Sequence, residues 1–141
     1  MAHPKVRRAK GSLAEQAAAT ARYVRRGKDM SPHVALGPAV RDPANPERWY
    51  FVVATGEAGT ARFDQINADD QLLAERFRAA VLLALSETEP PFVLHDFGDE
   101  LELIRFCQTL WPSDRVTAIR ARMEAERALE AASPDPASTL H

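Results

Sequence analysis

Hydrophobic residues recur every three or four positions in four segments of the chain, and this spacing predicts four helices. These segments span 12–27, 69–86, 100–111 and 113–132. The first begins with Ser12 and Glu15 at the spacing of a capping box, in which each side chain accepts a hydrogen bond from the other residue's backbone. In the last, a narrow apolar stripe runs among charged residues, as on a surface helix or one side of a subunit contact.

Three shorter segments have the composition of β-strands. Residues 48–54 are rich in aromatic and β-branched side chains and are apolar on both faces, which favours a central strand. Turn-forming residues follow, and 60–66 returns as the second strand of a hairpin. Residues 92–95 predict a third, short strand. Prolines at positions 32, 38, 43 and 46 interrupt 29–47, where we expect an irregular connector because proline lacks a backbone donor and restricts the residue before it.

Together these elements predict an α+β fold. We expect a small antiparallel or mixed sheet, made of the hairpin and one short strand, to pack against helices, with a basic N-terminal helix and a charged C-terminal helix. The predicted divisions are a basic arm and helix, a proline-rich connector, a core domain and a disordered tail, at 1–28, 29–47, 48–132 and 133–141. A chain of 141 residues can bury enough surface to fold as one domain without a disulfide, metal or cofactor.

The number of cysteines and the length of the apolar runs indicate where in the cell the protein is located. A single cysteine, Cys107, excludes an intramolecular disulfide. The N-terminus is not followed by an apolar run of signal-peptide length, and the longest such run, 79–85, is too short to cross a bilayer. We therefore expect a cytoplasmic protein without a membrane partner. Because 79–85 is apolar all round, we also expect its helix to be buried on more than one side.

Charge is divided unevenly along the chain. Residues 1–28 contain eight lysines and arginines and one glutamate, whereas the rest contains ten arginines and 19 acidic residues. The formal net charge of −2 therefore conceals a basic segment followed by an acidic body. Such a segment is typical of a contact with nucleic acid, and it also suits an acidic protein surface or the chain's own acidic body. We call residues 1–28 the basic segment.

The basic segment leads to a functional hypothesis: a non-enzymatic binding or regulatory protein that contacts nucleic acid or a nucleic-acid-associated partner. No base-reading motif is visible, so affinity for nucleic acid would come mainly from contacts with phosphates. The predicted binding residues are Arg7, Arg8, Lys10, Arg22, Arg25, Arg26 and Lys28. The narrow apolar stripe of residues 113–132 is also compatible with a homodimer that forms through this helix.

Two alternatives remain open. In the first, the chain is an acidic inhibitor or antitoxin-like protein whose body occupies a basic site on its target. Its binding surface would consist of Asp64, Asp69, Asp70, Glu75, Asp96, Asp99 and Glu100. In the second, the chain is a small metal-dependent enzyme with its site at His95 and Asp96. Against it, helix capping accounts for Asp99 and Glu100, and adjacent strand residues point to opposite faces.

Other candidate chemistry has simpler explanations. Cys107 lies within the apolar stripe of its helix, where cysteine acts as a small hydrophobic residue rather than as a nucleophile paired with His95. The aromatic run 49–51 is typical of a core strand rather than a base-stacking platform. Phosphate-binding loops, nucleophile elbows and zinc motifs are missing from the sequence, and the four histidines do not fall at metal-ligand spacing. We therefore predict no cofactor and no metal.

Overall fold

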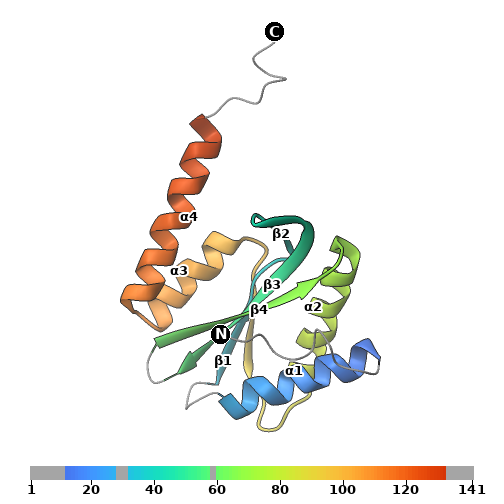
Figure 1. Cartoon of the computed structure of the whole chain (residues 1–141). Coiled ribbons are helices and arrows are strands. Elements are labelled where there is room, and N and C mark those ends of the chain that lie inside the picture. Colours follow the sequence, from blue (N-terminus) through green and yellow to red (C-terminus); the bar gives the residue numbers. More distant parts are fainter. Residues whose placement is uncertain (1–11, 28–31, 58–59, 133–141) are drawn as a thin grey trace.

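The computed structural model describes residues 12–27, 32–57 and 60–132, and it confirms an α+β fold with four helices and a mixed five-stranded sheet (Figure 1). The elements in chain order are α1 (Leu13–Gly27), β1 (His33–Leu36), β2 (Val40–Asp42), β3 (Asn45–Glu57), β4 (Thr60–Ala68), α2 (Gln71–Ser86), β5 (Val93–Asp96), α3 (Glu100–Leu110) and α4 (Asp114–Ala132). None of the helices among the described residues is long and apolar enough to cross a membrane.

Strand β3 organises the sheet. Along one edge it pairs antiparallel with β4, from Trp49 opposite Ala68 to Glu57 opposite Thr60, which is the predicted hairpin in longer form. Along the other edge it pairs with both β1 and β2. Strand β5 then lies parallel to β1. The prediction of a hairpin plus one short strand is therefore incomplete, because it lacks β1 and β2.

The two missing strands lie in the segment predicted to be an irregular connector, and that prediction is wrong for the described residues. Pro32 directly precedes β1, and Pro38 falls between β1 and β2. Neither proline removes a hydrogen bond from inside a strand, so both are compatible with the sheet. The backbone N–H of Gly37 donates to the Val52 carbonyl at 2.9 Å and keeps the chain against β3 between the two short strands.

Helices cover both faces of the sheet, α1 and α2 on one side and α3 with the start of α4 on the other (Figure 1). The first core contains buried side chains of α1, β1, β3, β4 and α2, among them Val24, Leu36, Phe51, Ile66 and Val81. The second contains Ala35 and Ala54 from the sheet together with buried residues of α3 and α4. Each face of the sheet thus has its own apolar core.

Helix α1 belongs to the first core. The predicted capping box forms: the Ser12 N–H donates to Glu15 Oε1 at 2.9 Å, and the Glu15 N–H donates to Ser12 Oγ at 3.2 Å. One face of the helix, with Ala17, Ala21 and Val24, is buried against the body. The small alanine side chains permit α1 to lie close to α2. Packing against α2 and the first core stabilises a helix whose own apolar stripe is thin.

Helix α2 faces the core differently from the prediction. Its buried residues are Ala74, Phe77, Val81 and Leu85. Leu83 is 60% exposed, so the apolar run 79–85 is not buried on more than one side. The helix lies on the outside of the sheet, and an outer layer leaves one helix face to solvent whatever its composition.

Trp111, at the end of α3, is inserted against the sheet. It is buried, and a Cβ atom at Gly56 would lie 2.1 Å from its indole Nε1. Glycine at position 56 of β3 therefore makes room for this ring. The chain then turns, and the Val116 N–H donates to Ser113 Oγ at 3.2 Å at the beginning of α4. Val116 is the buried residue of α4 among those described, and the helix extends beyond the sheet (Figure 1).

Candidate functional site

The structure separates the predicted basic residues. Arg7, Arg8, Lys10 and Lys28 lie outside the described residues, as does the side chain of Arg26. Arg22 and Arg25 remain, both on α1. Arg22 is exposed, whereas Arg25 is half-buried. In the described part of the chain, Arg22 is therefore the predicted binding residue that faces solvent.

Arg25 attaches α1 to the loop between α2 and β5. Its guanidinium donates to Thr88 Oγ1 at 2.9 Å and also to the Pro90 carbonyl. The same group lies 4.0 Å from the centre of the Phe92 ring, within cation–π distance. These contacts give Arg25 a structural role in holding α1 to the body.

Each of the seven acidic residues proposed for a charge-mimicking surface has a partner within the chain. Asp64 is 5% exposed and forms an ion pair with Arg62 at 2.9 Å. Asp96 pairs with Arg78, and Asp99 both caps α3 and pairs with Arg127. Glu100 accepts from Tyr50. The other three residues are exposed at or near the beginning of α2. Asp69 lies 3.9 Å from Arg48, Asp70 accepts from the Leu73 N–H, and Glu75 accepts from Gln71.

His95 and Asp96 point to opposite faces of the sheet. Asp96 forms an ion pair with Arg78 of α2, whereas His95 packs against Phe106 of α3 with the rings tilted and their centroids 4.3 Å apart. His95 Nε2 also lies 2.9 Å from Nδ1 of His33 on the neighbouring strand. Burial and the adjacent His33 lower the pKa of His95. Sequence spacing gave no sign of this pair, because the parallel pairing of β1 and β5 brings together residues 62 positions apart.

Cys107 lies in the core, as does one residue of the aromatic run 49–51. Cys107 is fully buried in the second core, and burial raises the pKa of its thiol to about 12. Phe51 is fully buried in the first core. Trp49 and Tyr50 are only half-buried, so the core interpretation applies to Phe51 alone. Among the residues that the structure describes, no group of three or more histidine, cysteine, aspartate or glutamate side chains is placed to hold a metal ion.

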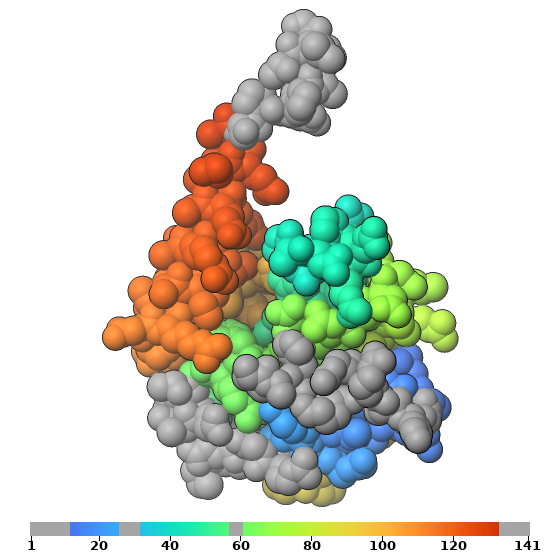
Figure 2. Space-filling model, viewed as in Figure 1, coloured from blue at the N-terminus to red at the C-terminus, as the bar shows by residue number. Residues whose placement is uncertain are grey.

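A cleft of about 810 Å³ lies between the sheet and the α3–α4 pair. Figure 2 shows it as the hollow between α4 and the segment joining β2 to β3. Its apolar lining comes from all three sides: Val40, Val52, Phe63, Leu103, Ile104, Ile119 and Met123. Its charged lining consists of Arg41, Asp42, Asp64, Glu100, Arg115, Arg122 and Glu126. No local pattern in the sequence indicates this site, because the cleft depends on how α4 crosses the sheet.

Tyr50 and Glu100 meet in this cleft. The Tyr50 hydroxyl donates to Glu100 Oε2 at 3.0 Å. Burial and the nearby Glu100 carboxylate raise the pKa of Tyr50, so the phenol stays protonated and remains a donor. Burial also raises the pKa of Glu100, although the bond from Tyr50 opposes that shift. The hydroxyl links β3 to the first turn of α3.

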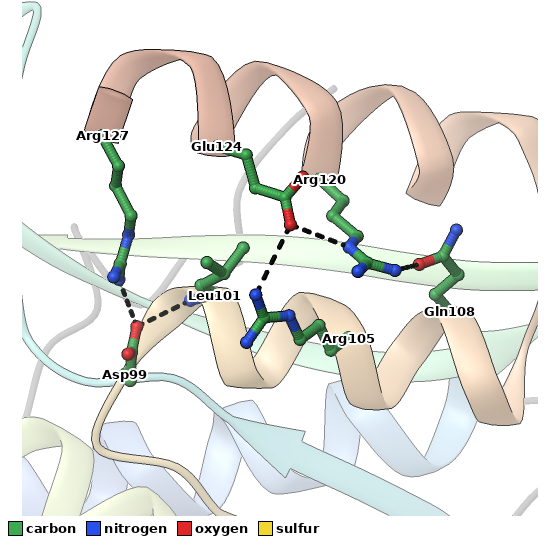
Figure 3. A network of polar contacts seen from close by, with 7 residues as sticks. All are labelled: Asp99, Leu101, Arg105, Gln108, Arg120, Glu124 and Arg127. Carbon is green, nitrogen blue, oxygen red and sulfur yellow. Dashed lines mark hydrogen bonds and ion pairs between the residues drawn. The ribbon is translucent and has the colours of Figure 1, made fainter. Parts of the chain in front are cut away.

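Polar contacts hold α4 against α3 and so fix one wall of the cleft (Figure 3). Glu124 accepts from Arg120 at 3.2 Å and forms an ion pair with Arg105 at 3.5 Å. Arg120 also donates to Gln108, and Arg127 reaches Asp99 at the beginning of α3. The prediction of a homodimer through the 113–132 helix stays a prediction, since this part of α4 forms its described contacts with its own chain.

The described residues thus hold an exposed arginine on α1, a histidine pair on the sheet and a cleft beside α4. No protein-family model, no curated protein sequence and no solved structure matches this chain. Its function is therefore inferred from these residues.

Proposed function

We propose that this chain is a non-enzymatic binding or regulatory protein that contacts nucleic acid, or a nucleic-acid-associated acidic surface, through its basic segment. The supporting observation is the different use of the two charge types. Arg22 of the basic segment is exposed, whereas most of the acidic residues proposed for the alternative surface have internal partners. Among the described residues, Arg22 is thus a predicted contact that is available to an external partner.

The acidic-inhibitor alternative needs a continuous surface of free carboxylates. Asp64 is buried and forms an ion pair with Arg62, and Asp96 forms an ion pair with Arg78. Removing either aspartate from its arginine to meet a partner would cost an existing ion pair. At the beginning of α2, Asp69 lies 3.9 Å from Arg48 and Asp70 caps the helix, so this patch too is engaged within the chain. We therefore favour the basic segment.

The metal-enzyme alternative needs His95 and Asp96 to converge on one point. They face opposite sides of the sheet, and each already has a partner. A change of strand register would be necessary to bring them together, because adjacent residues on a strand alternate in direction. This geometry supports a binding role over one in catalysis.

The proposal is tested with labelled DNA and the full chain at low ionic strength. Arg22→Glu should weaken binding roughly equally for unrelated sequences, since phosphate contacts carry no sequence information. Arg76→Glu is the matched control, because Arg76 is also an exposed helical arginine but lies on α2, outside the basic segment. Equal losses in the two variants would show that general charge, not the basic segment, causes the binding.

A further inference from the structure

The cleft between the sheet and α4 has the size and lining of a ligand site. Its volume of about 810 Å³ lies within the range usual for small-molecule pockets. Val52 and Phe63 come from the sheet and Ile104 from α3, while Ile119 and Met123 come from α4. A ligand in it would touch the sheet and both helices, which gives the apolar part of the cleft a defined shape.

The arginines of α4 fall into two groups according to the side of the helix on which they lie. Arg120 and Arg127, towards α3, both have acidic partners (Figure 3). Arg115 and Arg122, seven residues apart and therefore on one face, line the cleft instead. Neither has a carboxylate within ion-pair distance among the described residues. The arginines of α4 that face α3 are thus paired, whereas those that line the cleft are available.

Arg41, on β2, is a third arginine at the cleft, and it too has an aromatic rather than an acidic neighbour. Its guanidinium lies 5.3 Å from the Trp49 ring, as that of Arg115 lies 5.8 Å from Phe63. A guanidinium that lies against an aromatic ring keeps its N–H groups free to bind an anion in the plane of the guanidinium itself. The cleft therefore presents donors beside apolar surface.

The acidic residues of the cleft are less available than the arginines. Asp42 accepts from the backbone N–H of Ala44 at 2.9 Å, and Glu100 accepts from Tyr50 at 3.0 Å. Asp64 is paired with Arg62. Among the described residues, Glu126 has no such contact, and none of the three arginines has an acidic partner within ion-pair distance. Unpaired donors therefore outnumber unpaired acceptors among the charged lining residues, which favours an anion.

We propose that this cleft binds a small amphiphilic anion, with its carboxylate, phosphate or sulfonate head at Arg122 and its aliphatic or aromatic body on the apolar floor. Guanidinium groups bind such heads through two parallel hydrogen bonds. The apolar body supplies affinity in proportion to the area that it buries. This inference is independent of the role proposed for the basic segment.

Calorimetry of the full chain with decanoate tests the proposal, and decanol serves as the uncharged ligand of the same length. We expect saturable binding of one decanoate, and Arg122→Gln should weaken it about tenfold, as expected for loss of a charge-assisted hydrogen bond. Arg120→Gln is the matched control: it removes the same charge from α4 but on the side facing Glu124 and Gln108, and it should leave the affinity unchanged.

Three results would overturn the proposal. They are decanoate binding weaker than about 1 mM, decanol binding as tightly as decanoate, and equal losses in the two arginine variants. Amide chemical shifts locate the ligand: changes should concentrate at Val52, Phe63 and Ile119. Changes confined to the α1–α2 face would equally contradict the assignment of the site.

Discussion

His33 Nδ1 and His95 Nε2 lie 2.9 Å apart on two parallel strands. At this distance one ring donates and the other accepts, so the contact requires that at least one ring be neutral. Phe106 closes the pair from the α3 side. Protonation of both rings would therefore break this contact between β1 and β5.

We therefore expect the free energy of unfolding to decrease as the pH is lowered, in a way that depends on His95. The folded-state pKa of His95 is lowered, so the unfolded chain binds more protons at this site. The stabilisation that the neutral ring provides is complete above the unfolded pKa of about 6.5 and declines as the pH falls below it. Urea unfolding from about pH 7.5 to 5.5 measures this decline. His95→Gln should flatten the curve, and an unchanged slope in that variant would contradict the assignment.

Arg25 and Arg22 should differ sharply when each is replaced by alanine. Arg25→Ala removes the bonds to Thr88 and Pro90 and the contact with Phe92, and we expect a loss of about 1–3 kcal/mol in the free energy of unfolding. Arg22→Ala changes an exposed side chain and should stay within about 0.5 kcal/mol of the parent. Urea denaturation of the two variants checks this, and similar losses would refute the structural role of Arg25.

Gly56 should not tolerate a methyl group. Its Cβ would lie 2.1 Å from the Trp111 indole, so Gly56→Ala forces the ring or the strand to move. We expect a loss of about 1–3 kcal/mol in stability. Gly98→Ala is the control, because a Cβ there meets no atom within 4 Å. Thermal unfolding of both variants separates the close approach at Gly56 from a general effect of replacing glycine.

Cys107 should be unreactive while the chain is folded. It is fully buried, and burial raises the pKa of its thiol to about 12, so very little thiolate forms near neutral pH. Labelling with an aromatic disulfide reagent should proceed at the rate of unfolding and become fast in urea. Rapid labelling of the native protein would show that the thiol is accessible. Cys107→Ser should cost about 1–3 kcal/mol, since an unpaired hydroxyl replaces it in an apolar core.

Local patterns predicted most of the helices and the hairpin because their signals lie within a few residues. The capping box of Ser12 and Glu15 is such a signal, and it forms as expected. Strand β1 has only four residues between two prolines, too few for a periodic pattern to stand out. The contact of His33 with His95 depends on that strand, and therefore it was not predictable from spacing.

Burial of individual side chains was harder to predict, because it depends on which elements cover which face. Arg25 and Arg22 look equivalent in the sequence, but only Arg25 faces the loop after α2. Arg122 and Arg120 differ in the same way, one lining the cleft and the other facing α3. Replacing Arg22, Arg25 and Arg26 together with glutamate is therefore a poor test of binding. It would also remove the contacts by which Arg25 holds α1 to the body.

The salt dependence of DNA binding by the full chain tests the central claim most directly. If the basic segment binds phosphates, the logarithm of the affinity should fall linearly with the logarithm of the salt concentration, by about 0.9 per phosphate neutralised on duplex DNA and about 0.7 on a single strand. Variants that replace Arg7, Arg8 and Lys10 with glutamine should reduce that slope, while Arg76→Gln should leave it unchanged. We predict a steep slope that depends on the basic segment. No binding of duplex or single-stranded DNA even at low salt would contradict the account.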